Sequence, residues 1–295
     1  MRRALARRLA AAATIALAIA LPALAPPAAS ATEAAEATPL DYVALGDSYS
    51  AGSGIWPPDP QASPLCLRTT SNYPHVIAAA TGASLTDVTC GAAQTTHFYA
   101  PQYPGVPPQL DAVTADADLV TLTIGGNDNN TFIGAIVACG SAGTATLGYG
   151  SPCKDLYGSR FEDDVRTKTY PAVRKALADI RAKAPNARVA ILGYPWILPP
   201  SFDATCYAKM PVARGDVPYV RSLQSTLNAV IAQAAAETGV TFVDLAQASE
   251  GHDACAPASS RWVEPVLFGT NTVPVHPNAL GEAAMATRTM AVLGL

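Results

Sequence analysis

The sequence has few cationic residues, and it lacks the motifs that mark several common classes of enzyme. Its 295 residues include 19 Lys and Arg against 23 Asp and Glu. Nucleic-acid binding depends on clustered Lys and Arg, so we expect no nucleic-acid partner. No G-x-S-x-G, Walker or G-x-G-x-x-G motif occurs, and no C-x-x-C pair or Cys/His spacing suggests a metal site. We therefore expect neither a metal nor an organic cofactor.

An apolar run that approaches membrane-spanning length occurs only near the start of the chain. MRRALARR is basic, the Ala-rich run after it is barely long enough to span a bilayer, and Ala29-Ser30-Ala31 is typical of a cleavage site. We predict that residues 1–31 are a signal peptide and that the protein is secreted. Arg7-Arg8 leaves both the general secretory and the twin-arginine routes open. Removing this segment takes away four arginines and no acids, so the net charge changes from −4 to −8.

The remaining chain has the composition of one folded unit. Residues 32–39 are expected to form a flexible tail, and residues 40–295 a single domain, because a chain of this length can bury the core of one α/β unit. The 25 prolines and 21 glycines indicate long, shaped loops; a hydrophobic content of 49% argues against disorder.

An even number of cysteines in an exported chain indicates disulfides. Pairing in sequence order closes the smallest set of loops, and all six cysteines lie in or beside segments that we interpret as loops. The predicted disulfides are Cys66–Cys90, Cys139–Cys153 and Cys206–Cys255.

Short apolar, β-branched segments alternate with helical patterns along this domain. Strands are expected at 41–47, 84–89, 117–126, 187–195 and 239–246, and helices at 73–82, 166–185, 217–239 and 277–294. This alternation predicts an α/β fold with three layers (α/β/α), in which helices cover both faces of a five-stranded parallel sheet. Ligand sites in such folds lie beyond the carboxyl ends of the strands.

A serine follows the first expected strand in DYVALGDSYSAGSG, residues 41–54. Ser48 stands where the next helix begins, and free backbone N–H groups and the positive end of the helix dipole surround such a position. These features suit a nucleophile, but a helix-capping serine would occupy the same place. This motif alone does not decide between the two.

Two further loops at the same edge of the sheet carry hydrogen-bond donors. TLTIGGNDNNTF (121–132) presents Asn127, whose side-chain amide could stabilise an oxyanion; a calcium loop is excluded because its twelfth position is Cys139, not an acid. The small residues of TCGAAQTT (89–96) would let a backbone N–H point into the same site. A loop that merely carries a disulfide would have the same composition.

One histidine lies on a loop at this edge. His276, in TNTVPVHPNALG (270–281), comes after all five expected strands and directly before a proline suited to a helix start. A lone histidine is more often a surface or capping residue, so its significance depends on the serine and the asparagine.

Together, these stretches resemble the SGNH (GDSL-type) hydrolase family, and more closely its secreted bacterial lipase and esterase branch. The resemblance implies a flavodoxin-like fold in which Ser48 is the nucleophile, His276 the general base and Asn127 a side-chain oxyanion donor. It also implies that the Ser48 backbone N–H is a second oxyanion donor. The third donor falls in the turn after the second strand, where the family usually has glycine: this chain aligns Ala92 there, with Gly91 beside it.

The chain departs from the family pattern before the histidine. The family commonly has an aspartate three residues earlier, but Val273 occupies that position. Nδ1 of the base still needs an acceptor that holds its tautomer. We predict a Ser-His dyad in which the backbone carbonyl of Val273 or Pro274 orients His276, and a His276 pKa lower than in a triad. A carboxylate such as Asp253 or Glu264 bonded to His276 would contradict this hypothesis.

The predicted reaction is hydrolysis of carboxylic esters through an acyl-enzyme, with lipid or short-chain acyl esters as substrates. Phospholipids and acetylated polysaccharides are alternatives within the family, and a secreted binding module without turnover is the alternative from another class. A glycosidase would need paired carboxylates, and none stands out. We expect a monomer that makes at most transient contact with a lipid interface. Trp56, Phe98, Tyr99, Trp196 and residues 197–202 could line an acyl groove, or could only pack loops together.

Overall fold

The computed structural model of the chain describes residues 38–295, and residues 39–295 form a compact unit. The predicted signal peptide and most of the predicted tail lie outside the described residues. Among the helices of residues 38–295, none is both long and apolar enough to cross a membrane.

A five-stranded parallel sheet forms the centre of this unit. In the order β2-β1-β3-β4-β5, all neighbouring strands pair in parallel. β3 is buried along its whole length, as expected of a central strand that is covered on both faces. The α/β prediction is thus confirmed, and the strands end within a few residues of the expected positions. Their bounds are β1 (Asp41–Gly46), β2 (Ser84–Asp87), β3 (Leu119–Thr123), β4 (Arg188–Leu192) and β5 (Thr241–Val243).

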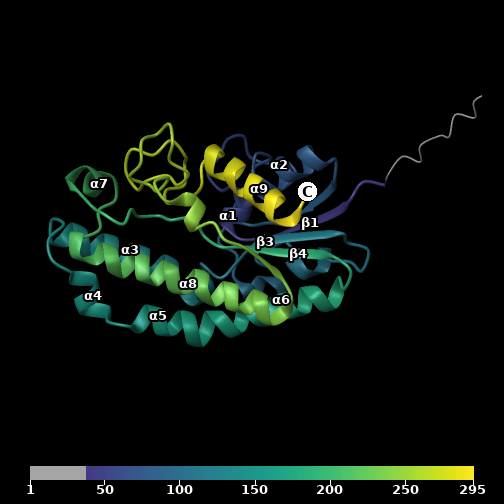
Figure 1. Cartoon of the computed structure of the whole chain (residues 1–295), viewed down its shortest axis with the longest axis horizontal. Helices are drawn as coiled ribbons and strands as arrows, with labels where there is room; N and C mark the ends of the chain where they lie inside the picture. The colour runs from purple at the N-terminus through teal and green to yellow at the C-terminus, as the bar shows by residue number, and fades with distance from the viewer. Residues whose placement is uncertain (1–37) are drawn as a thin grey trace, which may run out of the picture. The chain divides into compact units, whose positions relative to one another are not determined.

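Helices cover both faces of the sheet (Figure 1). Above it in this view lie α2 (Tyr73–Thr81) and α9 (Ala279–Leu293), and below it lie α3 (Phe132–Ala145), α6 (Tyr170–Lys183) and α8 (Val217–Thr238). α8 has a proline in its first turn and ends at Gly239 with a φ of 67°. Those are the residues that favour a helix start and a helix stop.

Several helices lie where the sequence predicted loops, which corrects the interpretation of the cysteine positions. Cys139, Cys153 and Cys206 lie inside α3, α4 (Pro152–Tyr157) and α7 (Ala204–Lys209); a further short helix is α5 (Arg160–Asp164). α3 was missed because FIGAIVACGSAGTA is rich in Gly, Ser and Thr, which have low helix propensity. Burial of one face of α3 and the disulfide to α4 compensate for that weakness. The disulfides themselves join the predicted pairs, in sequence order.

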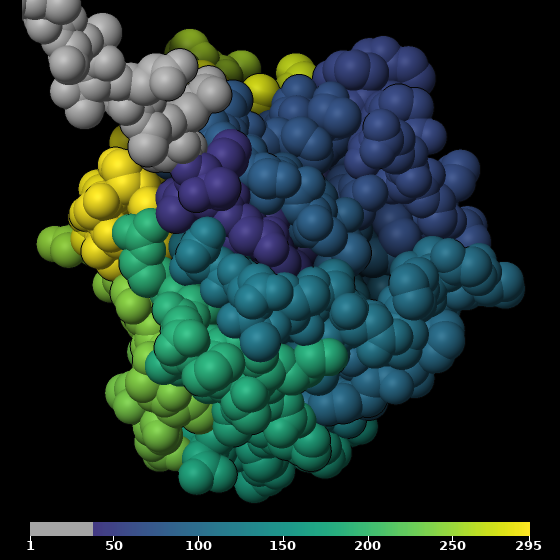
Figure 2. Space-filling view, turned by 90° about the vertical axis from the view of Figure 1, so that its right-hand side faces the viewer, coloured from purple at the N-terminus to yellow at the C-terminus, as the bar shows by residue number. Residues whose placement is uncertain are grey.

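The two edges of the sheet at which the strands begin and end differ from each other. Figure 2 faces the edge where the strands begin, and there the start of β1 (purple) lies at the surface between a blue segment and the yellow C-terminal helix. At the opposite edge, β1 ends at Gly46 with a φ of 124°, and a Cβ at this position would lie 2.4 Å from the Thr123 carbonyl oxygen. Only glycine fits so tight a turn. This turn directs the chain from β1 straight into α1 (Ser48–Ala51).

Candidate active site

The carboxyl edge of the sheet brings the three predicted side chains together. Ser48 is the first residue of α1, Asn127 follows β3, and His276 precedes α9. All three line one pocket, together with the Tyr49 and Tyr194 rings and the apolar residues Phe132, Ile133, Ile136, Ile197 and Val275. The site therefore lies where the topology predicts a ligand site.

The geometry of the serine and the histidine defines one tautomer. His276 Nδ1 lies 2.8 Å from the Pro274 carbonyl oxygen, and His276 Nε2 lies 2.7 Å from Ser48 Oγ. A carbonyl oxygen only accepts hydrogen bonds, so Nδ1 carries the proton and Nε2 carries the lone pair. The Ser48 hydroxyl accordingly donates to Nε2, which is the arrangement a general base requires.

Neither ring nitrogen of His276 meets a carboxylate in the described part of the chain. The two candidate acids have other partners. Glu264 forms a buried ion pair with Arg261 and also accepts hydrogen bonds from Asn278 and Thr270. Asp253 accepts the backbone N–H of Cys255. Of the two carbonyls predicted to orient the base, Pro274 makes the contact.

Burial lowers the pKa of His276 from its ordinary value of 6.5, and the Pro274 carbonyl opposes that shift only in part. Removing an imidazole from water disfavours its charged form. Desolvation is the main cause of this shift, and the comparison with the histidine of a triad stays a prediction. The same burial favours the neutral form of the His276 ring, which is the form that can accept a proton.

Asp47, the residue before the serine, organises the nucleophile turn. Its buried carboxylate accepts the Tyr49 backbone N–H at 3.0 Å, the Thr123 hydroxyl at 2.7 Å and the Tyr194 hydroxyl. Burial raises the Asp47 pKa to about 6, although the hydrogen bonds lower it. The Tyr194 hydroxyl also accepts the Gly126 N–H at 2.9 Å, so one phenol links the serine turn to the loop that carries Asn127.

The Asn127 side chain is half-buried and has one hydrogen to spare. Its Nδ2 donates to the Ala93 carbonyl oxygen at 3.1 Å, and an amide nitrogen has two hydrogens. The next residue, Asp128, accepts both the backbone N–H and the hydroxyl of Thr95 at 2.8 Å. These bonds join the loop after β2 to the loop after β3.

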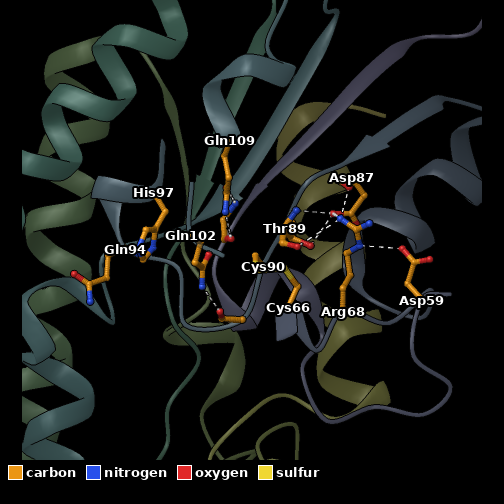
Figure 3. Close-up of a disulfide and its surroundings, with 12 residues drawn as sticks. Asp59, Cys66, Arg68, Asp87, Thr89, Cys90, Gln94, His97, Gln102 and Gln109 are labelled. Atoms are coloured by element: carbon orange, nitrogen blue, oxygen red, sulfur yellow. Dashed lines mark hydrogen bonds and ion pairs between the residues drawn. A yellow bond between two sulfur atoms is a disulfide. The ribbon is translucent and has the colours of Figure 1, made fainter. Parts of the chain in front are cut away.

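The turn after β2 is fixed by a disulfide and by side chains around it (Figure 3). The Cys66–Cys90 disulfide precedes Gly91, whose N–H donates to the Cys66 carbonyl oxygen at 2.7 Å and whose carbonyl oxygen accepts from Gln102 at 2.6 Å. Gly91 therefore has no free N–H. Ala92 has a φ of 62°, and its N–H has no acceptor within the described residues.

Sequence reasoning missed the residues that support His276. The Tyr49 hydroxyl donates to the Val275 carbonyl oxygen at 2.6 Å, and Val275 has a φ of 61°, which is strained for a β-branched residue. Backbone hydrogen bonds of 2.9 Å join Glu264 to both Val275 and His276. The available signals were weak: a tyrosine beside the serine, and an Arg-Glu pair three residues apart in a loop.

The described residues contain no cluster of three or more His, Cys, Asp or Glu side chains that could hold a metal ion. What the pocket does contain is a serine hydroxyl bonded to a neutral imidazole, with an amide donor alongside. A parallel α/β sheet with this set at its carboxyl edge has the architecture of a serine hydrolase that transfers acyl groups.

Comparison with known proteins identifies the family. The sequence profile described as "GDSL-like Lipase/Acylhydrolase family" matches residues 44–284. "Lipase 2" of Streptomyces coelicolor is 63% identical over 262 residues, which are 88% of each chain. The chain belongs to the GDSL-like lipase/acylhydrolase family, and it is a carboxylic ester hydrolase.

Two solved structures are similar to this one over most of their length. The phospholipase A1 of Streptomyces albidoflavus is 29% identical with a TM-score of 0.71, covering 87% of this chain and 98% of its own. The extracellular lipase of Streptomyces rimosus is 27% identical with a TM-score of 0.70, covering 86% and 99%. The predicted SGNH hydrolase fold and lipase or esterase class are thereby confirmed.

Proposed function

We propose that this protein is a secreted lipase or esterase that hydrolyses acyl esters through a Ser48–His276 dyad. The observation that carries the proposal is the 2.7 Å contact between Ser48 Oγ and His276 Nε2, with Nδ1 bonded to the Pro274 carbonyl oxygen. A binding module without turnover would not require this pairing of nucleophile and base.

The reaction begins when Ser48 Oγ attacks the ester carbonyl and His276 Nε2 takes its proton. The imidazolium then protonates the leaving alcohol, and the acyl group remains on Ser48. In the second half, His276 takes a proton from water while the water oxygen attacks the acyl carbonyl. The bond from the acyl carbon to Ser48 Oγ then breaks, His276 returns the proton to Oγ, and the carboxylic acid leaves. The Pro274 carbonyl keeps the ring oriented throughout both halves.

Three donors stabilise the oxyanion of each tetrahedral intermediate. They are the Ser48 N–H at the first position of α1, where the helix supplies no acceptor, the spare hydrogen of Asn127 Nδ2, and the Ala92 N–H. Ala92 is preferred to Gly91 because the Gly91 N–H already donates to Cys66. Position 91 requires glycine for a structural reason, because a Cβ there would lie 2.8 Å from the Cys66 carbonyl oxygen.

Secretion belongs to the same proposal. The signal peptide over residues 1–31 would be removed, and three disulfides suit an oxidising, extracellular environment. A structural relative is described as an extracellular lipase. N-terminal sequencing of the protein from culture medium tests the cleavage after Ala31. We further propose that it acts as a monomer with transient lipid contact.

The mechanism is tested by comparing Ser48→Ala with the wild-type protein on nitrophenyl esters. Loss of the nucleophile should lower kcat by about four to six orders of magnitude. Ser53→Ala is a matched control, because Ser53 Oγ is buried five residues away without a hydrogen-bond partner among the described residues. It should leave kcat within about twofold of the wild type. Turnover by Ser48→Ala within about tenfold of the wild type would rule out Ser48 as the nucleophile.

Two further measurements define the intermediate and the ester class. Rapid-quench mass spectrometry should detect an acyl group on the peptide that contains Ser48. Phospholipids and acetylated polysaccharides should be assayed beside the simple esters, since a relative of 29% identity is a phospholipase A1. Preferred turnover of either would narrow the substrate class without changing the mechanism.

A further inference from the structure

An apolar trough leads away from the catalytic pocket along one side of α3. Its volume is about 360 Å³, and it shares Ile133, Ile136 and Val275 with the pocket that contains Ser48 and His276. The opposite wall is formed by Pro211, Val266 and Pro274. The trough therefore directly adjoins the site of chemistry.

The α3 wall is one helical stripe. Beyond the shared isoleucines, Val137, Gly140, Ser141 and Thr144 line the trough, with the spacing of three and four residues that places side chains on one face. From Ile133 to Thr144 the stripe is about 16 Å long at the helical rise. That length is much more than an acetyl group needs.

The two hydroxyl groups on this stripe do not make it polar. Ser141 Oγ donates to the Val137 carbonyl oxygen, and Thr144 Oγ1 donates to the Gly140 carbonyl oxygen, each at 2.9 Å. Both hydroxyls are thus satisfied by their own helix and leave aliphatic atoms toward the trough. Val137 is 62% exposed, so apolar surface at the trough is in contact with water and gains from being covered.

Gly140 keeps the middle of the trough open. A Cβ built on this residue would have no heavy-atom neighbour within 4 Å. Gly143, on the same helix, contrasts with it, because a Cβ there would lie 2.4 Å from the Pro211 carbonyl oxygen. Close helix packing thus requires glycine at 143 but not at 140.

We infer that the trough binds the acyl chain of the ester, that its length favours medium and long chains over acetate, and that Gly140 determines this preference. The inference rests on the function proposed above. The acyl chain stays in the site through both half-reactions, whereas the alcohol leaves after the first and water must enter in its place. An apolar trough suits the part that stays. Each methylene bound there raises kcat/KM by up to about fourfold, equivalent to about 0.8 kcal/mol.

The test is a series of nitrophenyl esters, from acetate through butyrate to octanoate, assayed with Gly140→Leu, Gly140→Ala and the wild-type protein. Leucine should block the trough: kcat/KM for octanoate falls at least about tenfold, mainly through KM, while that for acetate stays within about twofold. Alanine should leave the preference unchanged. Ala145→Leu adds the same side chain to α3 outside the trough and should behave like the wild type.

Three results would overturn the inference, and none of them coincides with failure of the proposed function. The first is an equal loss on acetate and octanoate in Gly140→Leu, with unchanged thermal stability. The second comes from acetate esters of long-chain alcohols assayed beside the nitrophenyl series: a loss in Gly140→Leu confined to these esters would place the alcohol in the trough. The third is a wild-type protein that prefers acetate. By contrast, a wild-type protein inactive on every ester, or an active Ser48→Ala variant, would refute the function itself.

Discussion

The proposed nucleophile, Ser48, and its proposed base, His276, are held in place by different kinds of structure. Ser48 follows a central strand, and the buried Asp47 carboxylate ties its turn to β3 and to Tyr194. His276 lies on a loop outside the sheet. The Tyr49 hydroxyl and two backbone hydrogen bonds to Glu264 support this loop. The comparison teaches that the sheet defines one half of the dyad, whereas side chains far from the chemistry define the other half.

The largest effect should come from breaking the histidine side at Glu264. Glu264→Gln leaves the buried Arg261 unpaired, and breaking a buried ion pair costs about 3–5 kcal/mol of unfolding free energy. Below its lowered melting temperature the variant should keep its kcat within about tenfold, because Glu264 does not contact the His276 ring. Thermal unfolding and kinetics at low temperature measure the two effects separately.

Glu264→Gln also distinguishes the dyad from a triad. If Glu264 were the acid of a triad, kcat would fall by about four orders of magnitude in protein that remains folded. Glu250→Gln is the control for loss of an acid, since Glu250 pairs with Arg221 at the surface. It should change stability by less than about 1 kcal/mol.

A matched pair of tyrosine variants compares the two halves directly. Tyr194→Phe removes the hydroxyl that serves both Asp47 and Gly126, and Tyr49→Phe removes the hydroxyl that serves Val275. Each buried partner left unsatisfied costs about 1–3 kcal/mol, so Tyr194→Phe should be the less stable of the two. Tyr49→Phe should lower kcat about tenfold by loosening the strained loop before His276. If the two variants lost equal amounts of unfolding free energy and of kcat, the serine turn and the histidine loop would not be supported separately.

The smallest effect concerns the pH profile. Catalysis needs neutral His276, whose pKa lies below 6.5 because of burial, so the acidic limb of kcat/KM should have its midpoint below pH 6.5. Val273→Asp restores the acid that the family commonly has. A carboxylate near the ring favours the imidazolium and should move the midpoint upward by up to about one pH unit. The neutral control, Val273→Asn, should leave the midpoint unchanged. An acidic limb with its midpoint above pH 6.5 in the wild type would contradict the lowered pKa of His276.

The sequence predicted the residues that depend on strands and missed those that depend on packing. Ser48 and Asn127 were found because each directly follows an apolar strand, and parallel strands bring such positions to one edge. α3 was missed because its glycines and hydroxyl residues have low helix propensity. With α3 unrecognised, the acyl groove was sought among aromatic residues and residues 197–202, and of the latter range Ile197 does line the pocket that contains Ser48. Phe98 is instead buried in the core, and Trp56 is 80% exposed, beside a separate pocket.

The proposed third oxyanion donor could not be identified from the sequence motif in the turn after β2. Alignment placed Ala92 at the family's glycine position and left Gly91 beside it as a further candidate, since a backbone N–H depends on no side chain. The distinguishing fact is a hydrogen bond from Gly91 to Cys66, a residue 25 positions earlier in the chain. Long-range backbone pairing of this kind has no local sequence pattern. For the same reason, the sequence could predict only that the carbonyl of either Val273 or Pro274 orients His276, and the structure was needed to identify Pro274.

The use of a main-chain carbonyl to orient the base has an evolutionary consequence. An aspartate in a triad can be lost through a single codon change, but every amino acid supplies the carbonyl that His276 uses at position 274. No missense mutation at that position deletes the acceptor atom. Selection against loss of function therefore falls on loop shape, so that sites such as Tyr49 and Glu264 should tolerate less variation than their distance from the ester would suggest.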